Sequence, residues 1–213
     1  MKIKGWGEAT ALLEKNKLPF SKGLVVKKSE DALKIAKKFG FPVMLKIISK
    51  DVVHKSDVGG VVKANDENAI LSEFDLMLKN TKKKLPKAKV DGILVQKFEP
   101  GNEIIVGLKR DYQFGAVVIF GLGGIFVEVM KDVVFRVCPI DKKEAIEMIN
   151  EIKGISILKG ARGEKEADIE AIAEIISKTS KLAENKNILE IDFNPIIANE
   201  NGAKIVDVRI MTE

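Results

Sequence analysis

Apolar residues recur at two different spacings along this chain, and the spacings predict a mixture of helices and strands. Residues 30–39 place alanine, leucine and isoleucine on one side at helical spacing, between Ser29 as a candidate N-cap and Gly40 as a candidate C-cap. Short runs rich in valine and isoleucine predict buried strands. Helices are expected at 7–17, 30–39, 66–83, 141–152 and 166–183. Strands are expected at 20–28, 43–48, 61–64, 92–98, 103–109, 115–120, 125–130, 133–137, 188–194 and 204–209, with a further short strand after Pro195.

The order of these elements predicts an α+β fold with two mixed halves. The first half, residues 20–95, has two helices beside one small sheet. The second half, residues 96–213, has an antiparallel sheet with helices on one face, and residues 1–19 form a helix ahead of both. No linker rich in Ser, Gly or Pro separates the halves, so we expect them to share a cleft.

Composition narrows the class of protein. The chain has 213 residues, of which 46% are hydrophobic and 31% are charged, as in soluble globular proteins. No apolar run is long enough to span a membrane and no signal peptide is visible, so a cytoplasmic location is expected. Cys138 is the only cysteine, which excludes an internal disulfide and leaves oxygen ligands, and therefore Mg²⁺ or Mn²⁺, for any metal site. The net charge of +5 comes with few aromatic residues, which gives little support for nucleic-acid binding.

The stretch 42–63 combines a lysine within an apolar strand, a polar loop and two glycines. A predicted strand containing Lys46 leads into a loop with His54, the only histidine, and Gly59-Gly60 opens a returning strand. Backbone N–H groups at glycines can approach phosphate oxygens closely, and the lysine supplies positive charge. One interpretation is a phosphate cradle in which His54 acts as a lone nucleophile or acid/base. The alternative is a surface hairpin with a solvated loop.

Oxygen-bearing side chains gather near the C-terminus. Glu190, Asp192 and Asn194 occupy alternate positions of a predicted strand, so all three project from one face, and Asp207 lies on the strand that follows. Carboxylates and amides in this arrangement can hold a hard divalent cation beside a triphosphate. The alternative is an exposed polar face, although Asp, Asn and Glu are poor strand formers.

Other polar residues near predicted turns allow two interpretations each. Glu99 and Glu103 bracket the turn that joins the halves, where they could line a purine and ribose site or lie on the surface. The glycine-rich turn at 121–124 does not match the Rossmann fingerprint, and the chain has no P-loop motif. Glu128 and Arg136 could face the cleft or form surface ion pairs.

Four segments taken together resemble the ATP-grasp β subunits of ADP-forming acetyl-CoA synthetases. They span nearly the whole chain in the same order, which is more specific than any single glycine turn. The segments are FPVMLKI at 41–47 with HKSDVGGV at 54–61, FGLGGIFVEV at 120–129, LKGARG at 158–163, and EIDFNP at 190–195 with DVR at 207–209.

The resemblance implies an ATP-grasp fold, with ATP or ADP between two α+β subdomains and Mg²⁺ or Mn²⁺ beside the phosphates. It implies phosphate contacts from the first subdomain, adenine contacts near 96–99 and a ribose contact from Glu103. The implied nucleotide-binding residues are Lys46, Lys55, Ser56, Asp57, Gly59, Gly60, Gln96, Lys97, Phe98, Glu99 and Glu103. Asn194 and Asp207 match the metal positions of the family, with Glu190 and Asp192 beside them. Gln96 departs from the glutamate that many ATP-grasp proteins have at this position.

The resemblance also implies an activity and a partner. In this family phosphate passes between ATP and an acyl phosphate through phosphohistidine, and His54 resembles the carrier of the β subunit. The chain is too short to include the CoA-binding domains, so a separate CoA-binding α subunit is expected, in an α2β2 hetero-oligomer. The implied enzyme is an acid–thiol ligase, acetate–CoA ligase (ADP-forming). The alternatives are a β-type subunit similar to that of succinyl-CoA synthetase and a non-catalytic nucleotide-sensing module.

Overall fold

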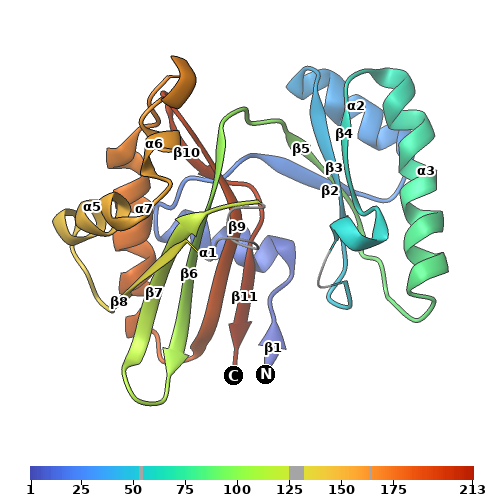
Figure 1. The fold of residues 1–213 in the computed structure, drawn as a ribbon. Coiled ribbons are helices and arrows are strands. Elements are labelled where there is room, and N and C mark those ends of the chain that lie inside the picture. Colours follow the sequence, from blue (N-terminus) through green and yellow to red (C-terminus); the bar gives the residue numbers. More distant parts are fainter. Residues whose placement is uncertain (53–54, 125–131, 164) are drawn as a thin grey trace. The chain divides into compact units, whose positions relative to one another are not determined.

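The computed structural model describes residues 1–52, 55–124, 132–163 and 165–213 (Figure 1). The chain forms two compact units, residues 21–98 and residues 1–20 with 99–213. The N-terminal segment therefore belongs to the same unit as the C-terminal half of the chain. His54 and the predicted strand at 125–130 lie outside the described residues. Among the residues described, no helix is long and apolar enough to cross a membrane.

The unit 21–98 is one antiparallel sheet covered on one face by two helices (Figure 1). The sheet order is β2-β5-β3-β4. The core joins apolar side chains of α2 and α3 to alternate residues of β3 and β5. The elements are β2 (Gly23–Val26), α2 (Ser29–Phe39), β3 (Val43–Ile48), the 3-10 turn η1 (Ser56–Val58), β4 (Val61–Ala64), α3 (Glu67–Lys84) and β5 (Gly92–Lys97).

The other unit is built on a larger antiparallel sheet. The path of this sheet is β1-β11-β9-β6-β7-β8, and β10 pairs with β9 beside it. Helix α7 packs over β6 and β7, and α5 packs over β7 and β8. The elements are β1 (Lys2–Ile3), α1 (Trp6–Lys15), β6 (Asn102–Asp111), β7 (Gly115–Leu122), β8 (Val133–Val137), α5 (Lys142–Glu151), α6 (Ile155–Leu158), η2 (Ala161–Gly163), α7 (Ile169–Lys181), η3 (Leu182–Glu184), β9 (Ile188–Asn199), β10 (Gly202–Ile205) and β11 (Arg209–Thr212).

The set of β9 residues whose side chains face the core changes halfway along the strand. Phe193 pairs with Val106, whereas Ile196 pairs with Ile104, so β9 has one more residue than β6 between these two pairs. Such a bulge reverses which residues point toward the core, and proline is tolerated there because the ladder is already interrupted. Asn194 and Pro195 therefore lie at a break in the sheet, directly after the polar run that begins at Glu190.

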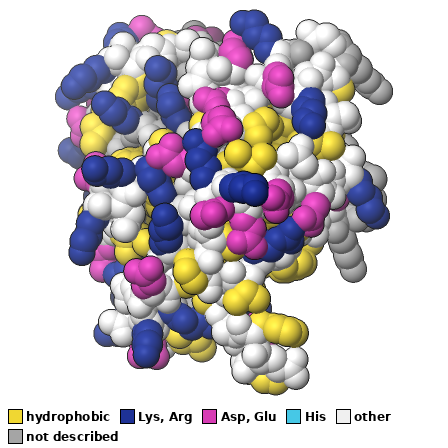
Figure 2. All heavy atoms as spheres, turned by 90° about the vertical axis from the view of Figure 1, so that its left-hand side faces the viewer, with side chains coloured by type: hydrophobic (Ala, Val, Ile, Leu, Met, Phe, Trp, Pro, Cys, Tyr) yellow, Lys and Arg dark blue, Asp and Glu magenta, His cyan; other side chains and the backbone are white. Residues whose placement is uncertain are grey.

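The outer surface of this second unit is mixed in charge and carries some apolar side chains. On the face drawn in Figure 2, lysine and arginine side chains alternate with acidic ones over the helical side of the unit. Hydrophobic side chains gather on the lowest projection, which is the β6–β7 hairpin of Figure 1. Tyr112 and Phe114 at that hairpin are 91% and 64% exposed.

Candidate functional site

Lys46 is a nearly buried lysine on the face of its sheet that the helices leave uncovered. Val43, Leu45 and Ile47 of β3 belong to the core beneath the helices, and alternation along the strand places Lys46 on the opposite face. Its side chain is only 6% exposed. A charged group is seldom buried to this extent without a counter-charge or ligand, because desolvation disfavours it.

Gln96 lies on the same face of the sheet as Lys46, opposite the helices. In the register of β3 and β5, Gln96 is opposite Met44 and Lys46 is opposite Leu94. Gln96 is fully buried, and its Nε2 donates a hydrogen bond to the Ser21 carbonyl at 3.2 Å. Among the described residues its Oε1 has no hydrogen-bond partner. Buried acceptors are almost always satisfied in folded proteins, so this oxygen marks an incomplete polar site.

The glycine turn after the polar loop is shaped by close backbone contacts. Gly60 N–H donates to the Lys55 carbonyl at 2.7 Å, and Ile47 N–H donates to the Gly60 carbonyl at 2.8 Å. A Cβ on Gly60 would lie 2.9 Å from the Lys55 carbonyl oxygen. Gly59 has a φ of 68°, in the left-handed region that favours glycine. Ser56 and Asp57 are exposed on this turn.

The residues on both sides of His54, the predicted phosphoryl carrier, are fixed to the rest of the unit. We call the stretch between Asp51 and Asp57 the carrier loop. Val52 is buried in the core, and the Asp51 carboxylate accepts a hydrogen bond from the Lys89 N–H at 2.8 Å. On the other side, the Asp57 carbonyl accepts a hydrogen bond from Lys84 Nζ. His54 itself lies outside the described residues.

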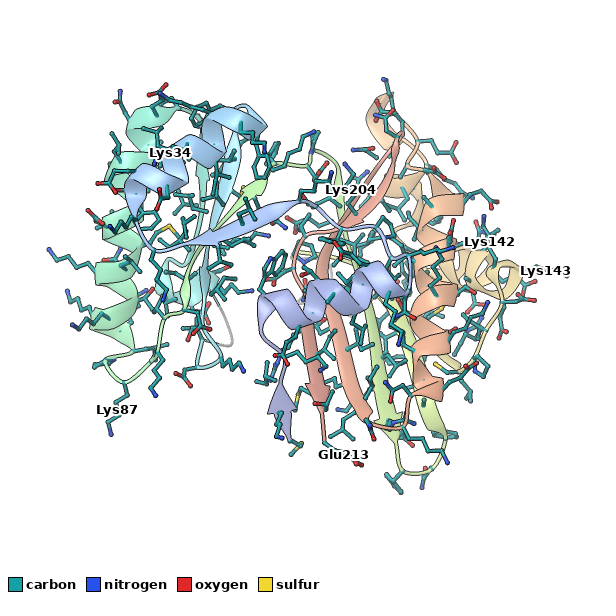
Figure 3. All side chains as sticks on the ribbon, turned by 180° about the vertical axis from the view of Figure 1, so that it is seen from behind. Lys34, Lys87, Lys142, Lys143, Lys204 and Glu213 are labelled. Carbon is teal, nitrogen blue, oxygen red and sulfur yellow. The ribbon has the colours of Figure 1, made fainter. Side chains whose placement is uncertain are left out.

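The residues predicted near the purine have several different environments. The Lys97 carbonyl accepts a hydrogen bond from Ser21 Oγ at 3.0 Å, while the Lys97 side chain is exposed. Lys63 Nζ lies 4.0 Å from the centre of the Phe98 ring. Glu99, whose side chain is 10% exposed, forms an ion pair with Lys204 at 3.0 Å, and Figure 3 labels Lys204 on β10. Glu99 therefore has a structural partner inside its own unit.

Glu103 lies against the glycine-rich turn that follows β7. Its carbonyl accepts a hydrogen bond from Gly123 N–H at 2.7 Å. A Cβ on Gly123 would lie 2.8 Å from the Glu103 Cβ, and one on Gly124 would lie 3.4 Å from Glu103 Oε2. The glycines thus let this turn approach Glu103, whose side chain remains exposed.

Three of the four predicted metal ligands lie on β9, whereas Asp207, which was expected on a strand, lies between β10 and β11. Glu190 and Asp192 alternate with buried core residues, and Asp192 lies opposite Arg209 of β11, a neighbouring cation that the sequence analysis did not include in the site. Asn194 is exposed at the bulge, and Asp207 N–H reaches the Pro195 carbonyl at 3.4 Å. The structure therefore brings Asp207 beside the bulge. Within the described part of the chain, no group of three or more His, Cys, Asp or Glu side chains is arranged to hold a metal ion.

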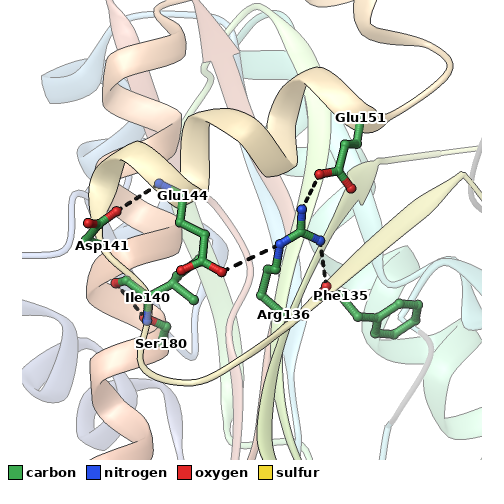
Figure 4. Close-up of polar contacts among 7 residues, drawn as sticks. All are labelled: Phe135, Arg136, Ile140, Asp141, Glu144, Glu151 and Ser180. Atoms are coloured by element: carbon green, nitrogen blue, oxygen red, sulfur yellow. Dashed lines mark hydrogen bonds and ion pairs between the residues drawn. The ribbon is translucent and has the colours of Figure 1, made fainter.

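Arg136 on β8 forms surface ion pairs, one of the two arrangements that the sequence allowed. Its guanidinium contacts Glu151 and lies 3.7 Å from Glu144, and it donates a hydrogen bond to the Phe135 carbonyl (Figure 4). Asp141 caps α5, the helix that carries both glutamates, by accepting a hydrogen bond from Glu144 N–H at 2.8 Å. These contacts attach the edge strand to α5.

Asp132 is a buried carboxylate that the sequence analysis missed. It is 7% exposed and accepts hydrogen bonds from the N–H groups of Lys153 and Gly154, at 2.9 and 2.8 Å. A Cβ on Gly154 would lie 2.3 Å from Leu122 Cδ1. Asp132 therefore fixes the loop after α5 to the start of β8.

Comparison with known proteins assigns the class to which this arrangement belongs. The ATP-grasp domain family matches residues 4–212. The chain therefore belongs to the ATP-grasp family, as both α+β units and the buried lysine on β3 suggest.

Two relatives that match most of this chain are ADP-forming acetate–CoA ligases. The chain is 47% identical to the β subunit of acetate–CoA ligase [ADP-forming] I of Pyrococcus furiosus over 96% of its own length and 89% of that subunit. It is 48% identical to acetate–CoA ligase [ADP-forming] I of Archaeoglobus fulgidus over 88% of its own length, but it spans only 28% of that longer protein.

Two solved structures of acetyl-coenzyme A synthetase 1 from Ca. Korarchaeum cryptofilum are also similar. A complex with coenzyme A and Ca-AMPCP matches with a TM-score of 0.94 and 43% identity, covering 100% of this chain and 94% of that one. A complex with coenzyme A and Mg-AMPPCP, whose phosphohistidine segment points towards the nucleotide-binding site, matches with a TM-score of 0.80 and 41% identity, covering 97% and 91%.

Proposed function

We propose that this chain is the nucleotide-binding β subunit of an ADP-forming acyl-CoA synthetase. The proposed overall reaction is acyl-CoA + ADP + phosphate ⇌ acid + CoA + ATP. The observation that carries the proposal is the 47% identity to a separate β subunit, of which the chain covers 89%. Because ATP and CoA are the substrates, we expect the reaction to run in the cytoplasm.

We propose that the nucleotide binds at the face of the sheet opposite the helices in the unit 21–98. Its buried lysine, Lys46, can neutralise phosphate charge, and Gln96 Oε1, which lacks a partner among the described residues, can accept a hydrogen bond from the amino group of adenine. In the turn at Lys55–Gly60 the N–H groups of Val58, Gly59 and Gly60 donate to carbonyls of the turn itself, so we propose that the Lys55 side chain of this turn reaches the phosphates. We propose that Ser56, Asp57, Gly59 and the 97–99 segment complete the nucleotide contacts on this chain, together with Glu103.

Asp207 and Asn194 are the proposed metal ligands, with Glu190 and Asp192 beside them. The donor set consists of carboxylate and amide oxygens, which suits Mg²⁺ or Mn²⁺, and the backbone of Asp207 lies next to the Pro195 carbonyl. A bound Mg²⁺ would neutralise charge on the phosphates during transfer.

His54 is the proposed phosphoryl carrier. An imidazole is largely uncharged near neutral pH, so one ring nitrogen can attack the γ-phosphorus without a separate base. A nitrogen–phosphorus bond forms, the bond between the γ-phosphorus and the bridging oxygen breaks, and ADP leaves with that electron pair. In the second step the carrier gives the phosphoryl group to the partner's site, where acyl phosphate is in exchange with acyl-CoA.

The proposal requires a CoA-binding α subunit, and we propose an α2β2 assembly. The test is acyl-CoA-dependent ATP synthesis by this chain, purified alone and after co-expression with the α subunit from the same cell. We expect nucleotide binding in both samples and ATP synthesis only in the complex. ATP synthesis by the isolated chain would contradict the need for a partner. Nucleotide binding without ATP synthesis in the complex would instead favour a sensing module.

A further inference from the structure

A lysine-rich segment begins in the last turns of α3, in the same unit as the proposed carrier loop. Residues 79–89 contain six lysines and no acidic residue, out of 36 lysines and arginines in the whole chain. Figure 3 shows Lys87 in the loop after α3, with its side chain directed away from the ribbon. We call the six exposed side chains the lysine surface: Lys79, Lys82, Lys83, Lys84, Lys87 and Lys89.

Ion pairs with the described residues do not neutralise the charge of the lysine surface. None of its six amino groups forms an ion pair with another described residue, whereas Lys37 and Lys142 elsewhere in the chain pair with glutamates at 2.9 and 2.7 Å. The C-terminal end of a helix stabilises nearby cations, which accounts for lysines in the last turn of α3. It does not account for Lys87 and Lys89, which lie beyond the helix.

The lysine surface is attached to both flanks of the carrier loop. Lys89 N–H donates to the Asp51 carboxylate at 2.8 Å, and Lys84 Nζ donates to the Asp57 carbonyl. Asp51 precedes His54 by three residues and Asp57 follows it by three. The segment that carries the lysine surface is therefore joined to described residues on both sides of the proposed carrier.

We propose that the lysine surface docks an acidic face of the CoA-binding partner subunit, around its phosphoryl-accepting site. This inference rests on the proposed function, because it names the surface through which the carrier meets its partner. Complementary charges at the rim of an interface raise the rate of association and fix orientation, and salt weakens both effects. The partner chemistry is thus a cluster of aspartate and glutamate side chains.

Zero-length carbodiimide cross-linking of the purified complex tests the docking directly. The reagent joins lysine amines only to carboxylates in contact with them. We expect cross-links from Lys82, Lys83 or Lys87 to aspartates or glutamates of the partner, suppressed by high salt. If other cross-links between the subunits form and none involves the lysine surface, the proposal is overturned.

Charge reversal tests what the docking does. In the triple variant Lys82→Glu/Lys83→Glu/Lys87→Glu, labelling of the chain by γ-labelled ATP should stay within two-fold of wild type. Transfer of that label to the partner should fall by about ten-fold or more at low salt, since steering by charge changes association rates by that order. The difference from wild type should shrink as salt is added.

A variant with the same change in charge provides the control. Lys38→Glu/Lys143→Glu/Lys186→Glu alters exposed lysines outside the lysine surface, and an equal loss of transfer in this variant would overturn the proposal. So would unchanged transfer in the first triple variant, even if that variant lost binding to anionic vesicles or RNA. If no variant is labelled by ATP, including wild type, the proposed function fails, and the cross-links still decide the docking.

Discussion

Replacing Gln96 with methionine separates a role in nucleotide binding from a role in folding. Methionine fills a similar volume but removes both polar atoms of the side chain. The loss of the hydrogen bond from Nε2 to the Ser21 carbonyl destabilises the unit by about 1 kcal/mol. Removal of the buried Oε1, which has no partner among the described residues, relieves a penalty of about 1–3 kcal/mol.

The two effects oppose each other, so the free energy of unfolding without nucleotide should change by no more than about 1–2 kcal/mol. Nucleotide affinity, in contrast to stability, should fall clearly. If the adenine amino group donates to Oε1, its loss removes about 1 kcal/mol and weakens ATP binding by roughly five-fold. Guanine presents an acceptor at the same ring position, so the preference of wild type for ATP over GTP should also shrink.

Two measurements on the same samples give the answer. Urea denaturation without nucleotide reports the free energy of unfolding, and calorimetric titration reports the dissociation constants for ATP and GTP. Gln113→Met, at an exposed glutamine of the β6–β7 hairpin, is the matched control and should change neither quantity. Unchanged ATP affinity with a large loss of stability in Gln96→Met would show that Gln96 is a structural residue only.

Other parts of the chain give three further predictions. Asp207→Asn should weaken binding of Mg·ATP much more than binding of metal-free ATP in calorimetry, and equal losses would count against a metal role. Asp132→Ala leaves the N–H groups of Lys153 and Gly154 without their acceptor, so we expect a loss of about 2–4 kcal/mol in unfolding free energy. Hydrogen exchange should accelerate at those two amides, and unchanged protection would refute the role of the carboxylate. Burial raises the pKa of the Cys138 thiol to about 11, against a lowering effect of Arg110. Because the thiolate is the reactive form, alkylation at pH 8 should be roughly 100-fold slower than at an ordinary cysteine and should accelerate as the pH approaches 11, and a rate equal to that of an ordinary cysteine would contradict this.

Local patterns in the sequence predicted most helices and strands of both units. The strand that holds Lys46 was expected at 43–48 and is found there as β3, because a short β-branched run beside glycine and proline leaves few alternatives. Helix caps were less accurate. Ser29 was expected as an N-cap but is the first residue of α2, and α3 begins at Glu67, after its cap Asp66, one residue later than expected. These shifts by one residue reflect how little the sequence alone fixes where a helix begins.

Long-range pairing accounts for what the sequence did not predict. The strand expected at 188–194 and the short strand expected after Pro195 form one strand, β9, because the bulge where β9 pairs with β6 tolerates the proline. The last strand was expected to be continuous at 204–209 but is divided into β10 and β11, which pair with opposite ends of β9. Such choices depend on partners far away in the sequence.

The candidate site likewise combines a feature that the local sequence pattern predicted with long-range contacts that it did not. Lys46 stood out because a charged residue in an apolar strand is unusual, and in the structure it is only 6% exposed. The hydrogen bond between Gln96 and Ser21 joins residues 75 positions apart, and no local pattern indicates it. The contacts of Asp132 with the end of α5 were missed for the same reason.

The central claim is that His54 carries phosphate between ATP and the partner subunit. It is tested most directly by incubating the complex with γ-labelled ATP, or with acyl phosphate, and locating the label by mass spectrometry. We expect an acid-labile, alkali-stable phosphoryl group on His54. In His54→Ala, ATP should bind within a few-fold of wild type while phosphate transfer is abolished, and Asn68→Ala, at an exposed position of α3, should behave as wild type. Full turnover by the His54→Ala complex, or a label at another residue, would contradict the account.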